Sequence, residues 1–108
     1  MQTNRRDFRR IAIELDVSEE IAGARTKVRA VELGELGMRY RKPADAPFAK
    51  DRQVKLEFHL PGDRRRVRVR GWVASEKVEG NDRYTSVTFA YLDDADAARL
   101  CHFVAARA

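Results

Sequence analysis

Four arginines lie within six residues near the start of the chain, in the stretch RRDFRRIAI at residues 5–13. Arg5, Arg6, Arg9 and Arg10 are followed at once by an apolar, β-branched run. Clustered arginine, rather than lysine, favours bidentate recognition of phosphate, carboxylate or guanine edges, because the guanidinium group is planar. The segment is therefore either a solvated, charged tail or an anion clamp attached to a strand.

A second group of arginines follows in the segment 64–70, where arginine alternates with valine. Arg66, Arg68 and Arg70 share one strand face, and the simplest interpretation is a solvated outer face that also discourages edge pairing. Trp72 has the same phase, so we expect its ring on the outer face as well. A large exposed ring usually has a partner. It would stack on a base, or pack under a helix or the N-terminal arm.

The composition predicts one soluble domain with an anionic partner. The chain has 108 residues, of which 44% are hydrophobic and 36% charged, and its net charge is +5. Its isoelectric point is about 9.8. This balance suits a modest core and an anionic polymer, a small nucleotide or an acidic protein. The single cysteine, Cys101, excludes an internal disulfide and a cysteine-based zinc site.

Neither a catalytic motif nor a targeting segment is evident. His59 and His102 have no serine or carboxylate motif beside them, and the aspartates of residues 93–96 suit a helix cap better than a metal loop. There is no P-loop and no dinucleotide fingerprint. We expect a binding module rather than an enzyme, with no cofactor and no metal. No signal peptide or membrane-spanning run is present, so we expect a cytoplasmic protein without membrane insertion.

Period-two alternation of apolar residues indicates about six short strands followed by one helix. Ile11, Ile13, Leu15 and Val17 illustrate the pattern in the first strand. Turn residues separate the strands, and an aspartate cap begins a helix over 93–106, with Ala97, Leu100, Cys101 and Val104 expected on its apolar face. The spacing predicts a mainly β domain, a closed barrel or a sandwich, over 10–108, preceded by a flexible arm over 1–9.

The arginine stretch resembles the RxxxR motif that opens PilZ domains. Arg6 and Arg10 hold that spacing closest to the strand, and Arg5 and Arg9 offer a second register. One strand later, the stretch VELGELG stands where the family has D/N-x-S-x-x-G. The segments FHLPGDRRRVRVRGWV and RYTSVTFAYLDDADAARLCHFV are similar to the later strands and terminal helix of the family. The resemblance covers nearly the whole chain.

The resemblance implies a small six-stranded antiparallel β-barrel with a C-terminal helix that binds the bacterial second messenger cyclic di-GMP. The motif arginines would contact phosphates and guanine Hoogsteen edges, and the second motif would meet the guanine and the phosphodiester. Ligand binding would order the arm and present a new surface to a protein partner, as in control of motility or biofilm formation. The candidate ligand-binding residues are Arg5, Arg6, Arg9, Arg10, Glu32, Gly34, Gly37 and Trp72.

The second motif departs from the family at two positions. Glu32 keeps a carboxylate, one methylene further out, where Asp or Asn is expected, and Gly34 replaces the serine. Loss of a serine hydrogen bond would cost about 1 kcal/mol, or about fivefold in affinity. One alternative is therefore a PilZ-like adaptor that has lost the nucleotide and acts through protein contacts. Restoring Asp and Ser at these positions would then raise the affinity strongly.

A third interpretation is a basic small barrel that binds single-stranded nucleic acid. Such proteins present several stacking aromatic rings on one face. Trp72 and Tyr40 are the main candidates here, and nothing in the sequence indicates that they are adjacent. Binding of single-stranded nucleic acid is therefore the least favoured of the three interpretations.

Overall fold

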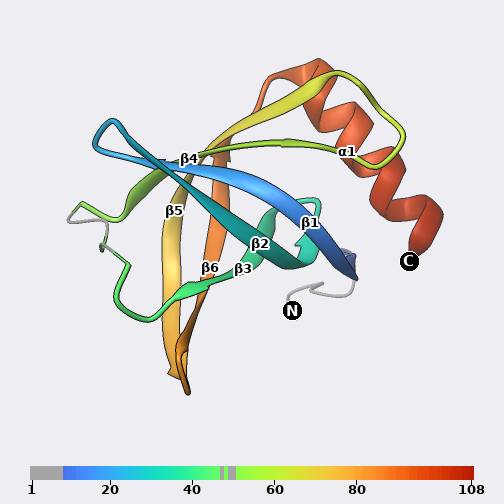
Figure 1. The fold of residues 1–108 in the computed structure, drawn as a ribbon. Helices are drawn as coiled ribbons and strands as arrows, with labels where there is room; N and C mark the ends of the chain where they lie inside the picture. Colours follow the sequence, from blue (N-terminus) through green and yellow to red (C-terminus); the bar gives the residue numbers. More distant parts are fainter. Residues whose placement is uncertain (1–8, 47, 49–50) are drawn as a thin grey trace, which may run out of the picture.

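The computed structural model describes residues 9–46, 48 and 51–108, and these form six strands and a terminal helix in the predicted order (Figure 1). The elements are β1 Arg10–Ile21, β2 Ala24–Gly34, β3 Gly37–Pro43, β4 Gln53–His59, β5 Arg66–Glu79, β6 Asp82–Tyr91 and α1 Asp94–Arg107. A two-residue turn joins β1 to β2, and both of its residues, Ala22 and Gly23, have positive φ. Such turns match the twist of the strands, so the hairpin is tight. Of the predicted arm, only Arg9 lies within the described residues.

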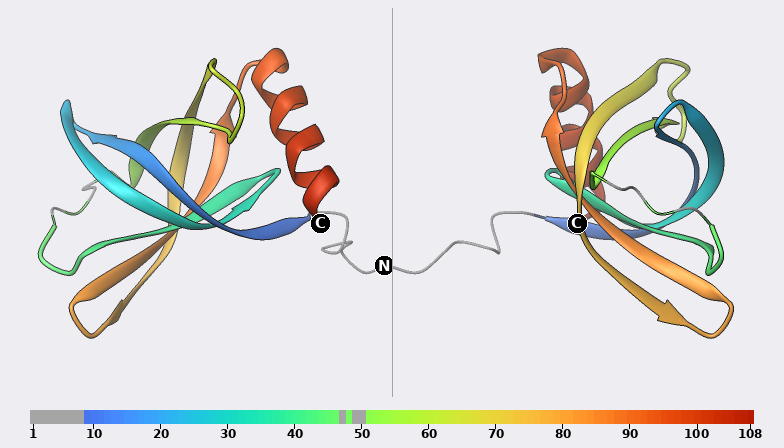
Figure 2. Two further views of the ribbon diagram at one scale, coloured as in Figure 1. Left: turned by 45° about the vertical axis from the view of Figure 1, so that its right-hand side comes forward. Right: turned by 90° about the vertical axis from the view of Figure 1, so that its left-hand side faces the viewer.

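The six strands close into a barrel in the order β1-β2-β3-β6-β5-β4, and all neighbouring strands are antiparallel. Pairing of β1 with β4, through Val17 and Phe58, completes the ring. The barrel is confirmed, and the sandwich that the spacing also allowed is excluded. Beyond the barrel, β5 and β6 continue as a projecting hairpin (Figure 2).

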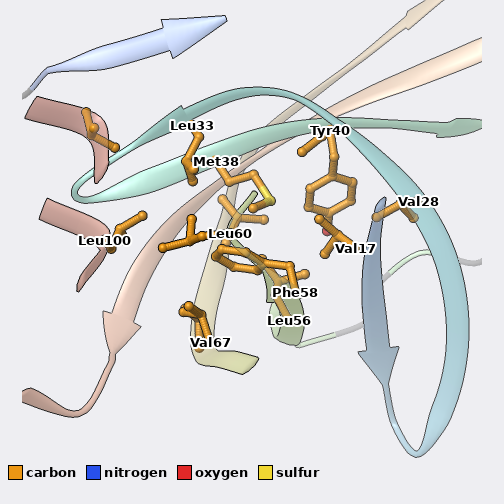
Figure 3. Close-up of a cluster of buried hydrophobic side chains, with 14 of the residues drawn as sticks. Val17, Val28, Leu33, Met38, Tyr40, Leu56, Phe58, Leu60, Val67 and Leu100 are labelled. Carbon is orange, nitrogen blue, oxygen red and sulfur yellow. The ribbon is translucent and has the colours of Figure 1, made fainter. Parts of the chain in front are cut away.

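Alternating apolar residues of the strands fill the interior, as their period predicts. Figure 3 shows side chains from several strands meeting there, with Tyr40 beside Val17 and Val28. Leu100 of α1 joins this core from outside the barrel. Apart from the buried Glu19, Lys42 and Arg83, the charged side chains of the strands mostly point outwards, so the same alternation that builds the core also places polar groups on the barrel wall.

The helix α1 lies at one end of the barrel, and its C-terminal end is beside the start of β1 (Figures 1 and 2). The Asp93 side chain caps it by accepting a bond from the Asp96 N–H at 2.8 Å, as predicted. The buried helical residues are Asp96, Leu100, Phe103 and Val104. The expectation for Cys101 is wrong, because this residue lies about 100° around the helix from Leu100 and is exposed.

Candidate ligand-binding site

The start of β1, the β2–β3 turn and the middle of β6 surround a hollow on the barrel wall. The hollow has a volume of about 280 Å³. It brings together five of the eight candidate residues, namely Arg9, Arg10, Glu32, Gly34 and Gly37. They meet because β1 and β2 are antiparallel and Arg10 pairs in register with Gly34. Arg5 and Arg6 lie outside the described residues. We call this site the arginine hollow.

Both described arginines of the first motif make ion pairs with carboxylates of the second. Arg9 Nη1 lies 3.2 Å from Glu35 Oε2, and Arg10 Nη1 lies 3.4 Å from Glu32 Oε1. The side chain of Glu35 is 18% exposed, whereas that of Arg10 is 72% exposed. Exposed pairs of this kind contribute at most about 1 kcal/mol, because water screens them. An incoming anion can therefore replace the carboxylates at small cost.

Gly34 allows the chain before β1 to approach β2 closely. A Cβ atom built at this position would lie 2.8 Å from the backbone oxygen of Arg9 and 3.2 Å from Cγ of Arg10. Contacts this short require the neighbouring atoms to shift. Glycine at position 34 therefore has two effects: it removes the serine hydroxyl, and it allows the backbone of Arg9 to pack against the end of β2.

Strand pairing brings further polar side chains to the arginine hollow. Arg39 of β3 pairs with Ser86 of β6, and Gly37 pairs with Thr88. Arg39, Ser86 and Thr88 all line the hollow, and the guanidinium of Arg39 also stacks on the Tyr84 ring with its carbon 4.8 Å from the ring centre. The sequence reasoning missed these residues. The alternation of β3 indicates that Arg39 shares a face with Gly37, but the pairing with β6 is a long-range contact that periodicity does not reveal.

Trp72 lies outside the arginine hollow. Its side chain is exposed on the outer face of β5, as its phase predicts, but it lines a separate hollow together with Phe48 and Tyr91. Tyr40, the second stacking candidate, is fully buried in the barrel, so that expectation is wrong. Tyr40 and Met38 face inwards because they alternate with the outward residues of β3.

The second group of arginines is largely engaged in ion pairs on the wall. The carboxylate of Glu57 in β4 forms ion pairs with three guanidinium groups, those of Arg25, Arg66 and Arg68, at N–O distances of 3.5, 3.2 and 3.0 Å. Burial would raise the pKa of Glu57, but the charges of Arg66, Arg25 and Arg68 outweigh it and hold that pKa below its ordinary value. This agrees with the interpretation of Arg66 and Arg68 as a charged outer face.

Residues 9–46, 48 and 51–108 contain no group of three or more His, Cys, Asp or Glu side chains that could hold a metal ion. Within the same residues, no helix is long and apolar enough to cross a membrane. The side chains that line the arginine hollow offer guanidinium, carboxylate and hydroxyl groups.

The sequence model of the PilZ domain matches residues 4–106, nearly the full length of the chain. The closed antiparallel barrel of this chain agrees with the architecture that the resemblance to this family implies. The chain belongs to the PilZ domain family. Proteins of this family are in general binding or adaptor modules rather than enzymes.

Two solved structures illustrate the fold. The inhibitor of motility of Bacillus subtilis, MotI or DgrA, superposes with a TM-score of 0.85 at 14% identity over 99% of this chain and 52% of that one. The PlzA protein of Borreliella burgdorferi, solved in complex with c-di-GMP, superposes with a TM-score of 0.58 at 10% identity, over 90% of this chain and 50% of that one. At such identities the similarity shows the fold alone. This chain spans about half the length of both proteins, and no curated protein sequence matches it.

Proposed function

We propose that this chain is a cyclic di-GMP receptor of the PilZ type, which binds the dinucleotide over the arginine hollow and transmits the bound state to a protein partner. The observation that carries the proposal is the convergence of Arg9 and Arg10 with the second-motif residues Glu32, Gly34 and Gly37. The likeness to PlzA, which was solved with c-di-GMP, supports the same ligand.

Each group in the arginine hollow suits one part of the dinucleotide. A guanidinium donates two bonds to guanine O6 and N7, worth about 1–3 kcal/mol of discrimination, or pairs with a phosphate. Glu32 can accept bonds from the guanine N1–H and N2–H₂ groups. The hydroxyls of Ser86 and Thr88 line the same hollow and can supply the hydrogen bond that Gly34 lacks.

The N-terminal arginines complete the site in this proposal. The volume of the hollow, about 280 Å³, lies just below the usual size range of ligand pockets, which begins near 300 Å³. A dinucleotide would therefore extend beyond it, and in this proposal Arg5 and Arg6, which precede Arg9 by only a few residues in the sequence, supply further contacts. We propose that binding changes the conformation of the N-terminal arm, and with it the surface that a partner meets.

A calorimetric titration with cyclic di-GMP tests the proposal. We expect binding in the micromolar range, a loss of about tenfold or more for Arg10→Ala, and no change for Arg64→Ala. Arg64 is a suitable control because it is exposed and does not line the arginine hollow. Absent or millimolar binding by the unsubstituted protein would contradict the proposal, and so would an equal loss in both variants.

The second candidate is an adaptor of the same family that does not bind the nucleotide. The internal ion pairs favour it, because Arg9 and Arg10 already have carboxylate partners. In that case neither Glu32→Gln nor Glu35→Gln, which free the arginines, would create measurable affinity for cyclic di-GMP. A gain in affinity in either variant would instead show that the carboxylates compete with the ligand.

A further inference from the structure

A second hollow, larger than the first, lies on the outer wall beside the β1–β2 turn. Its volume is about 920 Å³. Five large apolar side chains are exposed among the described residues, and three of them line this hollow: Phe48 at 60%, Trp72 at 48% and Tyr91 at 63% exposure. Clustered exposed apolar groups mark interaction sites, and aromatic residues are enriched at the centres of protein interfaces. We call this surface the aromatic hollow.

Two cations stand beside the rings. Lys55 of β4 pairs in register with Arg70 of β5, and Arg70 pairs on its other side with Tyr91 of β6. Both are exposed and line the aromatic hollow. Across the described part of the chain, neither makes an ion pair, whereas Arg66 and Arg68 of the same strand both contact Glu57. Lys55 and Arg70 are therefore available to a carboxylate from outside.

The charges of the aromatic hollow favour a protein over a nucleic acid. Glu20 and Asp51 also line it, so the formal charges of its lining side chains sum to zero, and Glu20 pairs with Arg25 at 3.5 Å rather than with Lys55 or Arg70. A polyanion with a phosphate at every nucleotide would gain little net attraction there, although attraction to phosphates dominates nucleic-acid binding. A polypeptide can place one carboxylate against the cations and an apolar side chain against the rings. Trp, Tyr and Arg are also the residues that contribute most of the binding energy at protein interfaces.

We propose that the aromatic hollow docks a segment of a partner protein that carries a carboxylate next to a large apolar side chain. The role of this surface in signalling rests on the proposed function, because a receptor that signals to a protein partner needs a surface that binds the partner. The peptide-binding surface itself follows from the exposed rings and the available cations.

The two hollows meet at the neighbouring strands β5 and β6. Trp72 lines the aromatic hollow and pairs in register with Thr88, which lines the arginine hollow. Next to Trp72, a Cβ atom at Gly71 would lie 2.5 Å from Cγ1 of Val87 and 2.7 Å from the oxygen of Thr88. The strands β5 and β6 thus approach closely beside Trp72, and Thr88 belongs both to this contact and to the lining of the arginine hollow.

Selection from a phage-displayed library of random peptides against the full chain, without nucleotide, tests the surface. We expect enriched sequences with Asp or Glu next to Leu, Ile, Phe or Trp. Because Trp72 is the only tryptophan of the protein, its emission should change when such a peptide binds. Binding should fall at least tenfold in Trp72→Ala and Arg70→Ala. It should be unchanged in Val78→Ala, an apolar site elsewhere on β5 that is at least as exposed as Trp72.

Three results would overturn the inference: no shared sequence among the selected peptides, equal binding by Trp72→Ala and Val78→Ala, or displacement of the peptides by oligo(dT) at physiological salt, which would identify a nucleic-acid surface. The outcome is separable from the test of the proposed function. Peptide binding at Trp72 without any cyclic di-GMP binding would contradict only the receptor function. Nucleotide binding without peptide binding would contradict only the docking surface.

Discussion

Glu19 and Lys42 form an ion pair inside the barrel. They are 2% and 3% exposed, and Lys42 Nζ lies 2.8 and 3.0 Å from the two carboxylate oxygens. The hydroxyl of Tyr40 donates to the same carboxylate. Burial, followed by the charge of Glu19, raises the pKa of Tyr40 above its ordinary value, so the phenol stays protonated and remains a donor. These partners allow two charges to stay in the interior.

Removal of only one partner should be far more damaging than removal of both charges. We expect Lys42→Met to lower the free energy of unfolding by about 3–5 kcal/mol, because the Glu19 carboxylate would be left buried without its cation. The double variant Glu19→Gln, Lys42→Met should recover most of the loss, since the amide can still accept from Tyr40. Urea denaturation of the three proteins measures this. A double variant as unstable as Lys42→Met would contradict the explanation.

Gly34 gives a second prediction at the level of single residues. A side chain there would displace the backbone of Arg9, so Gly34→Ala should weaken cyclic di-GMP binding in a titration. The free energy of unfolding, measured on the same variant, is the control and should change much less than for a core substitution. Tighter binding by Gly34→Ser would contradict this, and would indicate that the missing hydroxyl outweighs the close approach.

At the level of elements, one arginine fixes α1 to the barrel. Arg99 lies 2.6 Å from Asp63 of the β4–β5 loop, bonds to the buried Asp96 of its own helix, and donates to the carbonyl of Arg66 at 3.0 Å. The Arg68 N–H also donates to Asp96, at 3.3 Å. A loop, a strand and the helix are thus joined by one network, which positions Leu100 for its place in the core.

This network should make the fold sensitive to acid. The pKa of Asp63 is held below its ordinary value by a bond from the Arg65 N–H and then by Arg99. Because the pKa of Asp63 is lower in the folded state than in the unfolded state, the ionised carboxylate stabilises the fold at pH values above its ordinary pKa near 4. This stability is lost as the pH falls through the pKa of the folded state. The melting temperature should therefore fall from pH 5 to pH 2, and by less in Asp63→Asn. Parallel curves for both proteins would contradict a role for Asp63.

The elements themselves could be predicted from the sequence because their apolar periods are strong. The orientation of α1 against the barrel could not be predicted, because the apolar residues of a helix do not show which of them lies at the centre of the buried face. Cys101 and Leu100 are neighbours in sequence, yet only Leu100 reaches the core. The same limit applies to the site. The arginine and glycine motifs identified five of its residues, whereas Ser86, Thr88 and the position of Trp72 depend on which strands pair.

At the level of the whole molecule, one barrel wall carries two surfaces of different chemistry. The arginine hollow combines cations, carboxylates and hydroxyls, and the aromatic hollow combines rings with two available cations. The strands β5 and β6 separate them at Thr88 and Trp72. In the proposed function, such an arrangement would let a partner one strand away detect a bound nucleotide.

The proposed function depends on cyclic di-GMP binding over the arginine hollow. Titration of the isotope-labelled protein with cyclic di-GMP, followed by amide resonances, tests it most directly. We expect the largest shifts at Arg10, Glu32, Gly34, Gly37 and Thr88 and smaller ones at Trp72. In Arg10→Ala the same shifts should need about tenfold more nucleotide or more. An unchanged spectrum at millimolar nucleotide, or shifts confined to α1 and the β4–β5 loop, would contradict the account.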